Sequence, residues 1–581
     1  MDFKIAAVIV AVIVAAAAAL QYFARPKCAA AVLGVAFAFA MAVSPWPMIM
    51  SLRRVHPGLK RTPMAEIRRV WYGASAAFGL FVALGMIFRK SSGGRLRQWE
   101  APRPAINTDK ALGRILSGEP DKKGTLLGCA SGGQEVHITP ADRQQHMQIV
   151  GPTRSGKSQL LFALTGQDMR QGMPVFFMEA KGDSSDFDQF LKLAGLAHRT
   201  HDVRYFNPQD PRSMTFNPIR RLPDQDVTEV ANQIARAIGR EPSSSGEAQD
   251  YYRAVDYARM VNMAEVFCAT DREFTLKDCL AYFSSEKARK KAFELCGDAH
   301  AIKAANADFK GNPDMSALTS SIRPWTSGRL GQLLNDYSPQ IKLEEVFEQD
   351  QLAYFAVPIG KLQVLANPLG RMVLSGLMSV ASTRQRMEPK PRAASVILDE
   401  FAEFATPVFS SFIATVASAK FWTVLSHQDM GQLKRIQGMD AEAFRSVVFA
   451  NTGGCKVCFR TPAPEDAEFW SAMLGTYKSF KDTERFQKGF FGASGTGEIS
   501  RREVDEYKVH PNFLKKLLPG TALILASGKN EGLARTAGVA RLLEPVTLPT
   551  LVPPTTKPTQ GLNLTVEIEA GQRFTRDGQL V

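Results

Sequence analysis

The residues of this chain best suited to chemistry form an eight-residue stretch, Gly151 to Ser158, that reads G-P-T-R-S-G-K-S. This spacing is that of the G-x-x-x-x-G-K-[ST] phosphate loop, in which backbone N–H groups surround the phosphates of a nucleotide. An apolar run suited to a buried strand, Met147 to Val150, precedes the loop, and apolar residues at helical spacing follow it. These flanks disfavour a chance match in an ordinary turn. We therefore expect ATP to bind eight consecutive residues: Gly151, Pro152, Thr153, Arg154, Ser155, Gly156, Lys157 and Ser158.

Hydrolysis needs two residues of the loop itself and three that come later in the chain. Lys157 is expected to reach the β and γ phosphates, and Ser158 is expected to bind Mg²⁺. The apolar run in "ASVILDEFAEF" ends in Asp399 and Glu400, which we interpret as a second Mg²⁺ ligand and as the acid that polarises the attacking water. The alternative is an acidic pair that caps a helix after a core strand. Gln428 follows the strand-like run "FWTVLSH" and is predicted to sense the γ-phosphate.

The elements that must position these residues alternate between strands and helices. "CKVCFRT" and "TALILASG" are two more buried-strand candidates, so the pattern predicts an α/β fold with a mostly parallel sheet. Cys455 and Cys458 lie in such a strand and face opposite sides of it, so we expect core cysteines and no zinc site. The glycine-rich stretch Gly492 to Ser500 has Glu498 where a phosphate loop needs lysine, and we expect a flexible surface loop there.

The first hundred residues are different in composition. They contain three apolar segments, Ile5 to Ala24, Ala29 to Met50 and Val70 to Phe88, each close to the roughly 20 residues that cross a bilayer. A cleaved signal peptide is the alternative for the first segment. The chain carries a net charge of +14, but residues 1–100 hold 13 lysines and arginines against 3 acidic residues. This basicity indicates membrane orientation rather than DNA binding. Whether two or three of these segments span the membrane remains open, and we expect the phosphate loop to lie in the cytoplasm.

The chain is too long for one ordinary core, and nearly 250 residues separate the phosphate loop from Asp399. The stretch from Asp224 to Gln340 has helical patterns and lacks apolar strand runs, which predicts an inserted all-α domain. The predicted organisation is a membrane anchor (1–98), a nucleotide-binding domain in two parts (99–223 and 341–545), the insert (224–340), and a Pro/Thr-rich linker with a short tail (546–581).

Six short motifs occur in the order found in type IV secretion coupling proteins of the TraD/TraG type, which this chain resembles between about His137 and Leu543. They are "VGPTRSGKS", "EAKGD", "TFNPI", "VILDEFAEF", "SHQDMGQLK" and "NTGGCKVCFRT". The resemblance implies a RecA-like P-loop NTPase domain with an inserted all-α domain and N-terminal transmembrane helices. It implies ATP and Mg²⁺ as cofactors, with Ser158 and Asp399 on the metal side, Glu400 as the catalytic acid and Gln428 as the sensor.

The same resemblance implies a multi-pass protein of the bacterial inner membrane with a cytoplasmic ATPase domain, forming a homohexamer. Its expected partners are DNA, a relaxase–DNA complex, the secretion channel ATPases and the inner-membrane channel proteins. The chain departs from the family at one position. The family commonly has an arginine about a dozen residues before the sensor glutamine, where it acts on the neighbouring subunit's nucleotide, and in this chain only Lys420 is close to that position. We predict that Arg460 supplies this charge, with Arg445 and then Lys420 as alternatives.

Two other functions are considered. One is a DNA translocase of the FtsK type, which is disfavoured because about twenty residues follow the linker Pro545 to Gln560, too few for a DNA-reading winged-helix module. The other is a secretion adaptor that binds ATP and partner proteins without moving anything. Stimulation of ATP turnover by DNA separates this adaptor from a conjugative motor.

Overall fold

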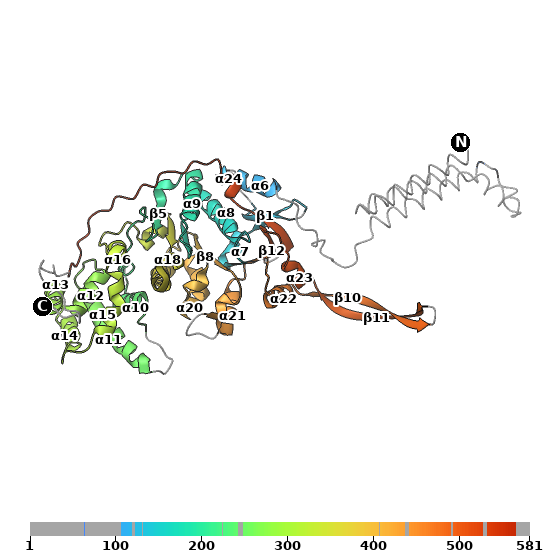
Figure 1. Ribbon diagram of the computed structural model, residues 1–581. Coiled ribbons are helices and arrows are strands. Elements are labelled where there is room, and N and C mark those ends of the chain that lie inside the picture. The colour runs from blue at the N-terminus through green and yellow to red at the C-terminus, as the bar shows by residue number, and fades with distance from the viewer. Residues whose placement is uncertain are drawn as a thin grey trace. The chain divides into compact units, whose positions relative to one another are not determined.

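The structure is a computed structural model of the chain (Figure 1). It divides into two compact units, Met1–Arg95 and Leu96–Val581. The residues it describes are Pro63, Ala65, 106–118, 123–130, 132–223, 225–241, 248–405, 407–435, 441–489, 492–526 and 532–564. The three apolar segments predicted to span the membrane lie outside the described residues.

Within the described part of the chain, one helical stretch, Ile359–Arg386, has the length and apolar composition that could cross a membrane. Of its most apolar window, 61% is buried inside the protein. Its larger part is helix α19 (Ala366–Arg386), whose buried residues belong to the main hydrophobic core. Packing against the rest of the fold accounts for its apolar composition.

The centre of the fold is an eleven-stranded sheet in the order β2-β1-β13-β12-β9-β3-β8-β7-β4-β6-β5. The strands are β1 (Thr125–Ala130), β2 (Glu135–Ile138), β3 (Met147–Val150), β4 (Val175–Glu179), β5 (Val203–Phe206), β6 (Leu352–Ala356), β7 (Ala394–Leu398), β8 (Phe421–His427), β9 (Cys455–Cys458), β12 (Thr521–Ala526) and β13 (Gly532–Thr536). From β9 to β5 all neighbours are parallel. The α/β fold and the strands expected around the site are confirmed.

The prediction of a mostly parallel sheet needs a correction at one end. Strand β12 pairs antiparallel with β9 and β13, and β1 pairs antiparallel with β13 and β2. The sheet is therefore mixed. Short connections account for two of these four pairs, because β13 follows β12 and β2 follows β1 within a few residues, and antiparallel strands need no crossover helix. Cys455 and Cys458 are fully buried in β9, as predicted for core cysteines.

Helices cover both faces of the sheet, which is why the parallel strands are apolar throughout. On one face, Phe177 of β4 stacks on Phe162 of helix α8 (Lys157–Arg170), with ring centroids 5.3 Å apart. On the other face, the neighbouring Phe176 lies 6.4 Å from Phe347 of helix α17 (Leu343–Glu348). Alternate residues of one strand therefore belong to two separate cores, and this double burial fixes the strand's register.

The described residues between β5 and α17 form helices and no strand of the sheet. They are α10 (Val227–Ile238), α11 (Ala248–Cys268), α12 (Leu276–Ser284), α13 (Glu286–Cys296), α14 (Ala299–Ala307), α15 (Ser316–Ile322) and α16 (Gly328–Leu334). Figure 1 shows them in green, with α11 to α16 grouped together. Their assignment to a separate domain with limits at 224 and 340 stays a prediction.

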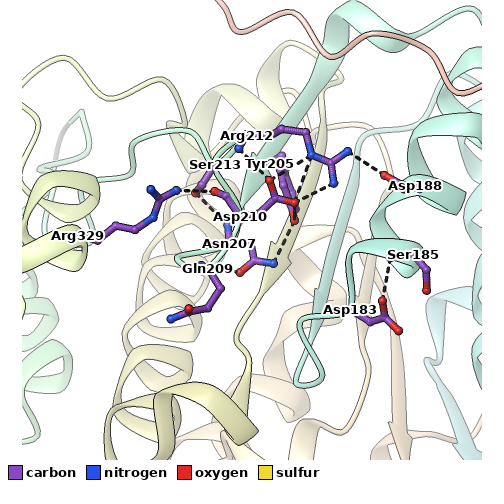
Figure 2. A network of polar contacts seen from close by, with 10 residues as sticks. All are labelled: Asp183, Ser185, Asp188, Tyr205, Asn207, Gln209, Asp210, Arg212, Ser213 and Arg329. Carbon is purple, nitrogen blue, oxygen red and sulfur yellow. Dashed lines mark hydrogen bonds and ion pairs between the residues drawn. The ribbon is translucent and has the colours of Figure 1, made fainter.

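A polar network ties the loop after β5 to helix α9 and to the last helix of this region (Figure 2). The guanidinium of Arg212 bonds Asp188 of helix α9 (Ser184–Leu196) and Asp210 at 2.8 Å each. The guanidinium of Arg329, in α16, donates to the carbonyl oxygens of Pro208 and Asp210 at 2.7 and 2.6 Å. The loop after β5 is therefore held from both sides, by the α/β part and by the helical region.

A long hairpin lies outside the main sheet. Strands β10 (Thr476–Gly489) and β11 (Gly492–Tyr507) pair antiparallel from Thr476↔Tyr507 to Gly489↔Gly492, with one irregularity, and form a two-stranded ribbon drawn in orange in Figure 1. The prediction of a flexible loop over Gly492 to Ser500 is therefore wrong. Cross-strand pairing overrides the poor strand propensity of its glycines, because strand formation depends on the partner more than on intrinsic preference.

The described end of the Pro/Thr-rich stretch packs against the helical region. Leu562 and Leu564 are buried, and the backbone N–H of Leu564 donates to Asp278 Oδ1 of α12 at 2.8 Å. A bridge joins Glu273 to Gly561, where an added Cβ would lie 2.5 Å from the Tyr337 ring. This segment therefore connects the sheet region to the helices a second time.

Candidate functional site

The predicted site residues all follow strands at the carboxyl edge of the parallel part of the sheet. The phosphate loop follows β3, the pair Asp399 and Glu400 follows β7, Gln428 follows β8, and Arg460 follows β9. Strand β8 lies between β3 and β7, and β9 lies on the other side of β3. Because parallel strands present their carboxyl ends at one edge, the fold brings these residues to the edge where ligands of open α/β sheets bind.

The loop has the close packing that its glycines predict. Gly156 has φ +112°, and a Cβ there would lie 3.0 Å from the backbone of Gly520. A Cβ on Gly151 would lie 2.6 Å from the side chain of Phe459. The N–H of Gly520 donates to the carbonyl of Ser155 at 2.7 Å, which anchors the loop to the turn before β12. Helix α8 begins at Lys157, so its positive N-terminal end faces the loop.

Lys157, Glu400 and Gln428 meet in this site. The Nζ atom of Lys157 lies 2.9 Å from Oε1 of Glu400, and Gln428 Nε2 donates to the same oxygen at 3.2 Å. Lys157 and Glu400 are both 5% exposed. Glu400 adopts a left-handed backbone conformation, φ 54°, which is uncommon for a residue with a side chain and tends to occur at functional sites. The loop lysine and the predicted sensor therefore both bond the same carboxylate oxygen of the predicted acid.

Ser158 and Asp399, the predicted magnesium ligands, are joined by a third side chain. The ammonium group of Lys181 lies 2.9 Å from Ser158 Oγ and 3.0 Å from Asp399 Oδ2, and Ser426 Oγ donates to Asp399 Oδ1 at 2.8 Å. Burial alone would raise the pKa of Asp399, but the charges of Lys181 and Lys157 and these hydrogen bonds hold it below its ordinary value. Asp399 is therefore ionised at neutral pH, as a metal ligand must be.

The residues present fit a magnesium-bound triphosphate. An ionised carboxylate and a hydroxyl converge on one cation, and oxygen ligands of this kind suit Mg²⁺. Ser155 Oγ in the loop and Glu400 Oε2 are buried and have no hydrogen-bond partner among the described residues. Buried polar atoms are normally paired, and unpaired ones point to a missing ligand or water. Of the two carboxylate oxygens of Glu400, Oε1 is bonded to Lys157 and Gln428, and Oε2 is the unpaired one.

The neighbouring carboxylate of Glu179, at the end of β4, is 1% exposed. It accepts the N–H groups of Lys181 and Gly182 at 2.5 and 2.9 Å. Burial raises its pKa from 4.5 to about 8 against the effect of these bonds. Glu179 therefore closes the turn that carries Lys181, and its burial favours the protonated form of its carboxyl group.

The elevated pKa of Glu179 predicts how stability depends on pH. Between pH 4.5 and about 8 the folded chain binds one proton more than the unfolded chain, so the free energy of unfolding should fall as pH rises through this window, by at most about 5 kcal/mol. Urea unfolding at several pH values should show that Glu179→Gln loses less stability than wild type between pH 5 and pH 8. Parallel pH profiles for the two proteins would contradict the assignment.

The three candidates for a charge acting on the neighbouring subunit lie in different places. Arg460 is exposed and directly follows Phe459, which packs on the phosphate loop of the same chain. Arg445 lines a cavity of about 460 Å³ together with Pro152 and Gln428. Lys420 lies just before β8, at the edge of the sheet opposite the loop. Which of them acts across an interface stays a prediction.

Sequence reasoning missed two residues of the site, Lys181 and Ser426. Lys181 belongs to the "EAKGD" stretch, and Ser426 lies two residues before Gln428. The available signal was positional, because polar residues at or just after the carboxyl end of a parallel strand point to the ligand edge of the sheet.

A protein-family comparison matches part of this chain. The family TraG-D_C, described as "TraM recognition site of TraD and TraG", matches residues 394–515. This stretch begins at β7 and contains Asp399, Glu400, Gln428, Arg460 and the hairpin. The resemblance to type IV secretion coupling proteins is confirmed. Among coupling proteins, the Type 4 coupling protein DotL of Legionella pneumophila is 20% identical over 453 residues, covering 67% of this chain.

The chain spans about half the length, 55%, of that curated coupling protein. Solved structures also match. The plasmid coupling protein TrwB in complex with an ATP analogue gives a TM-score of 0.49 at 16% identity, covering 76% of this chain and 93% of TrwB. TrwB with ADP and Mg²⁺ gives 0.48 at 15% identity, covering 77% and 94%. VirB4 of Thermoanaerobacter pseudethanolicus gives 0.45 at 13% identity, covering 73% and 98%.

Proposed function

We propose that the chain is an ATP-hydrolysing coupling protein of a conjugative type IV secretion system, anchored in the inner membrane. As a homohexamer it would recruit a relaxase–DNA complex and drive DNA into the secretion channel. The observation that carries this proposal is the convergence of Lys157, Glu400 and Gln428 on one carboxylate oxygen beside the phosphate loop. A site that only bound nucleotide would not need this acid and amide at the γ-phosphate end.

The residues of the site divide the work of phosphoryl transfer. Lys157 and the N-terminus of α8 bind the phosphates, and Glu400 takes a proton from the water that attacks the γ-phosphate. Gln428 orients Glu400 and releases it when the γ-phosphate is lost. Ser158 and Asp399 would hold Mg²⁺, which when bound neutralises charge on the phosphate oxygens.

The test is ATP turnover by the full chain in detergent, with and without single- and double-stranded DNA. Turnover that DNA stimulates supports a DNA motor. Nucleotide binding without turnover, with or without DNA, would instead favour a secretion adaptor that binds ATP and partner proteins.

The stretch that matches the family description suggests a second partner. In TraD and TraG this region is described as the recognition site for TraM. We propose that residues 394–515 of this chain bind an accessory transfer protein in addition to forming half of the nucleotide site. Binding of such a protein that is lost when the hairpin Thr476 to Tyr507 is replaced by a short turn, with ATP turnover retained, would support this.

Glu400→Gln is predicted to bind ATP normally and to hydrolyse it about 10²- to 10⁴-fold more slowly, because the amide fills the same space but cannot accept the proton of water. Binding of a fluorescent ATP analogue and phosphate release measure the two effects separately. Glu403→Gln, three residues on and also acidic, is the matched control and should turn over ATP at the wild-type rate. Normal turnover by Glu400→Gln would show that Glu400 is structural.

A further inference from the structure

Lys181 is the least expected side chain of the nucleotide site. It lies two residues beyond β4, in the turn from Ala180 to Asp183, and its ammonium group bonds both Ser158 Oγ (2.9 Å) and Asp399 Oδ2 (3.0 Å). These two oxygens are the ones assigned to Mg²⁺. One lysine cation therefore contacts both predicted ligands of a divalent cation.

The turn that carries Lys181 is firmly held. Glu179 accepts the N–H groups of Lys181 and Gly182. Gly182 has φ +69°, and a Cβ there would lie 2.3 Å from the side chain of Pro358. The N–H of Ile359 donates to the carbonyl of Ala180 at 3.0 Å. Since the backbone is fixed on both sides, movement of the ammonium group must come from rotation of its four-carbon stem.

The two lysines of the site differ in their access to solvent. The side chain of Lys157 is 5% exposed and bonds Glu400, whereas that of Lys181 is 40% exposed and bonds Asp399. Lys181 therefore has a route into water that Lys157 lacks. A lysine stem can keep its carbon chain against the protein while the charged end moves outward.

The buried carboxylate explains why a cation is needed there at all times. Asp399 has a side chain that is 2% exposed, and a buried charge without a partner is strongly destabilising. Lys181 supplies that partner, because its ammonium group lies 3.0 Å from Asp399 Oδ2. The lysine cation therefore compensates the buried carboxylate.

We propose that Lys181 is a resident cation that occupies the divalent-metal position between Ser158 and Asp399 in the nucleotide-free chain and yields it when the metal–nucleotide complex binds. This inference rests on the proposed function, because it concerns the same ATP site. Two cations cannot share the position, since like charges about 4 Å apart repel strongly where solvent is limited. The chain should therefore bind a divalent metal well only together with nucleotide, whose phosphates supply further oxygen ligands.

The test measures binding of Mn²⁺ alone to the nucleotide-free full chain in detergent at pH 8, from the electron paramagnetic resonance signal of free Mn²⁺. Wild type should bind Mn²⁺ weakly. Lys181→Met should bind at least about tenfold more tightly, because the competing charge is gone. Lys181→Gln, which keeps a polar group next to Ser158, should do the same, and Lys181→Arg, which keeps the charge, should resemble wild type.

Lys361→Met is the matched control, because Lys361 is an exposed lysine in the segment that packs on the same turn. It should bind Mn²⁺ as wild type does. Unchanged Mn²⁺ affinity in both Lys181→Met and Lys181→Gln, with circular dichroism spectra like that of wild type, would overturn the inference. The proposed function fails by a different result, namely no binding or turnover of Mg²⁺–ATP by wild type, so the two failures are distinguishable.

Discussion

Lys157→Ala is expected to abolish ATP turnover, with a loss of about 10³-fold or more, because it removes the cation that faces the phosphates inside a buried site. The same change removes the partner of Glu400 at 2.9 Å, so the acid is left buried without its charge partner. Phosphate release and binding of a fluorescent ATP analogue are the measurements, and both should fall.

The control separates loss of chemistry from loss of folding or membrane insertion. Lys361→Ala removes an exposed lysine near the same edge of the sheet and should leave turnover unchanged. Both variants should remain with the membrane fraction after alkaline extraction, because neither change touches the apolar segments before residue 89. DNA transfer at the wild-type level by Lys157→Ala would reject the motor function.

The positions of the loop and of the pair Asp399 and Glu400 at the sheet edge were predictable because local patterns fix both. A short apolar strand followed directly by the loop or by Asp399 and Glu400 can only deliver those residues to the strand's carboxyl end. Parallel pairing of β3, β8 and β7 then brings them together. Side chains that are 243 residues apart, Lys157 and Glu400, therefore meet without any local signal linking them.

Lys181 could not be assigned in this way. Its position two residues past β4 is visible in the sequence, but its partners depend on β7 being the neighbour of β4 in the sheet, and Asp399 lies 218 residues away. Glu179 belongs to the same "EAKGD" stretch, and no pattern in the sequence indicates its role. In the structure its carboxyl group closes the turn that positions Lys181.

The antiparallel end of the sheet and the hairpin were missed for another reason. Strand β1 contains Gly128, and the Cβ of any other residue there would lie 2.0 Å from the carbonyl oxygen of Arg535 in β13. The close approach of a partner strand that comes more than 400 residues later in the chain makes this glycine necessary. In β11 the glycines again are extended because β10 pairs with them. Glycine alone predicts a loop, and the extended conformation follows only from pairing with the partner strand.

We predict that Arg460 acts on the nucleotide of a neighbouring subunit, so Arg460→Ala alone should lose ATP turnover. Where an arginine acts across an interface in P-loop NTPases, it contributes about 10³- to 10⁵-fold to the rate. Arg460 is exposed, as a residue that reaches another subunit must be. It also lies next to Phe459, which packs on the phosphate loop of its own chain. This position is compatible with action on the nucleotide of the same subunit or on that of the neighbour, so a single substitution cannot distinguish the two cases.

Mixing two inactive variants separates them. If Arg460 completes the neighbour's site, an Arg460→Ala subunit still has an intact phosphate loop. The Arg460 of an adjacent Lys157→Ala subunit can then complete the site at that loop. In rings mixed at random in equal amounts, about one site in four then combines an intact loop with an intact arginine, because ring interfaces are heterologous. Turnover should recover to about a quarter of wild type. If Arg460 instead serves its own loop, each subunit carries its own defect and no mixture recovers. That outcome, or full turnover by Arg460→Ala alone, moves the prediction to Arg445 and then to Lys420, each tested by the same mixing with Lys157→Ala.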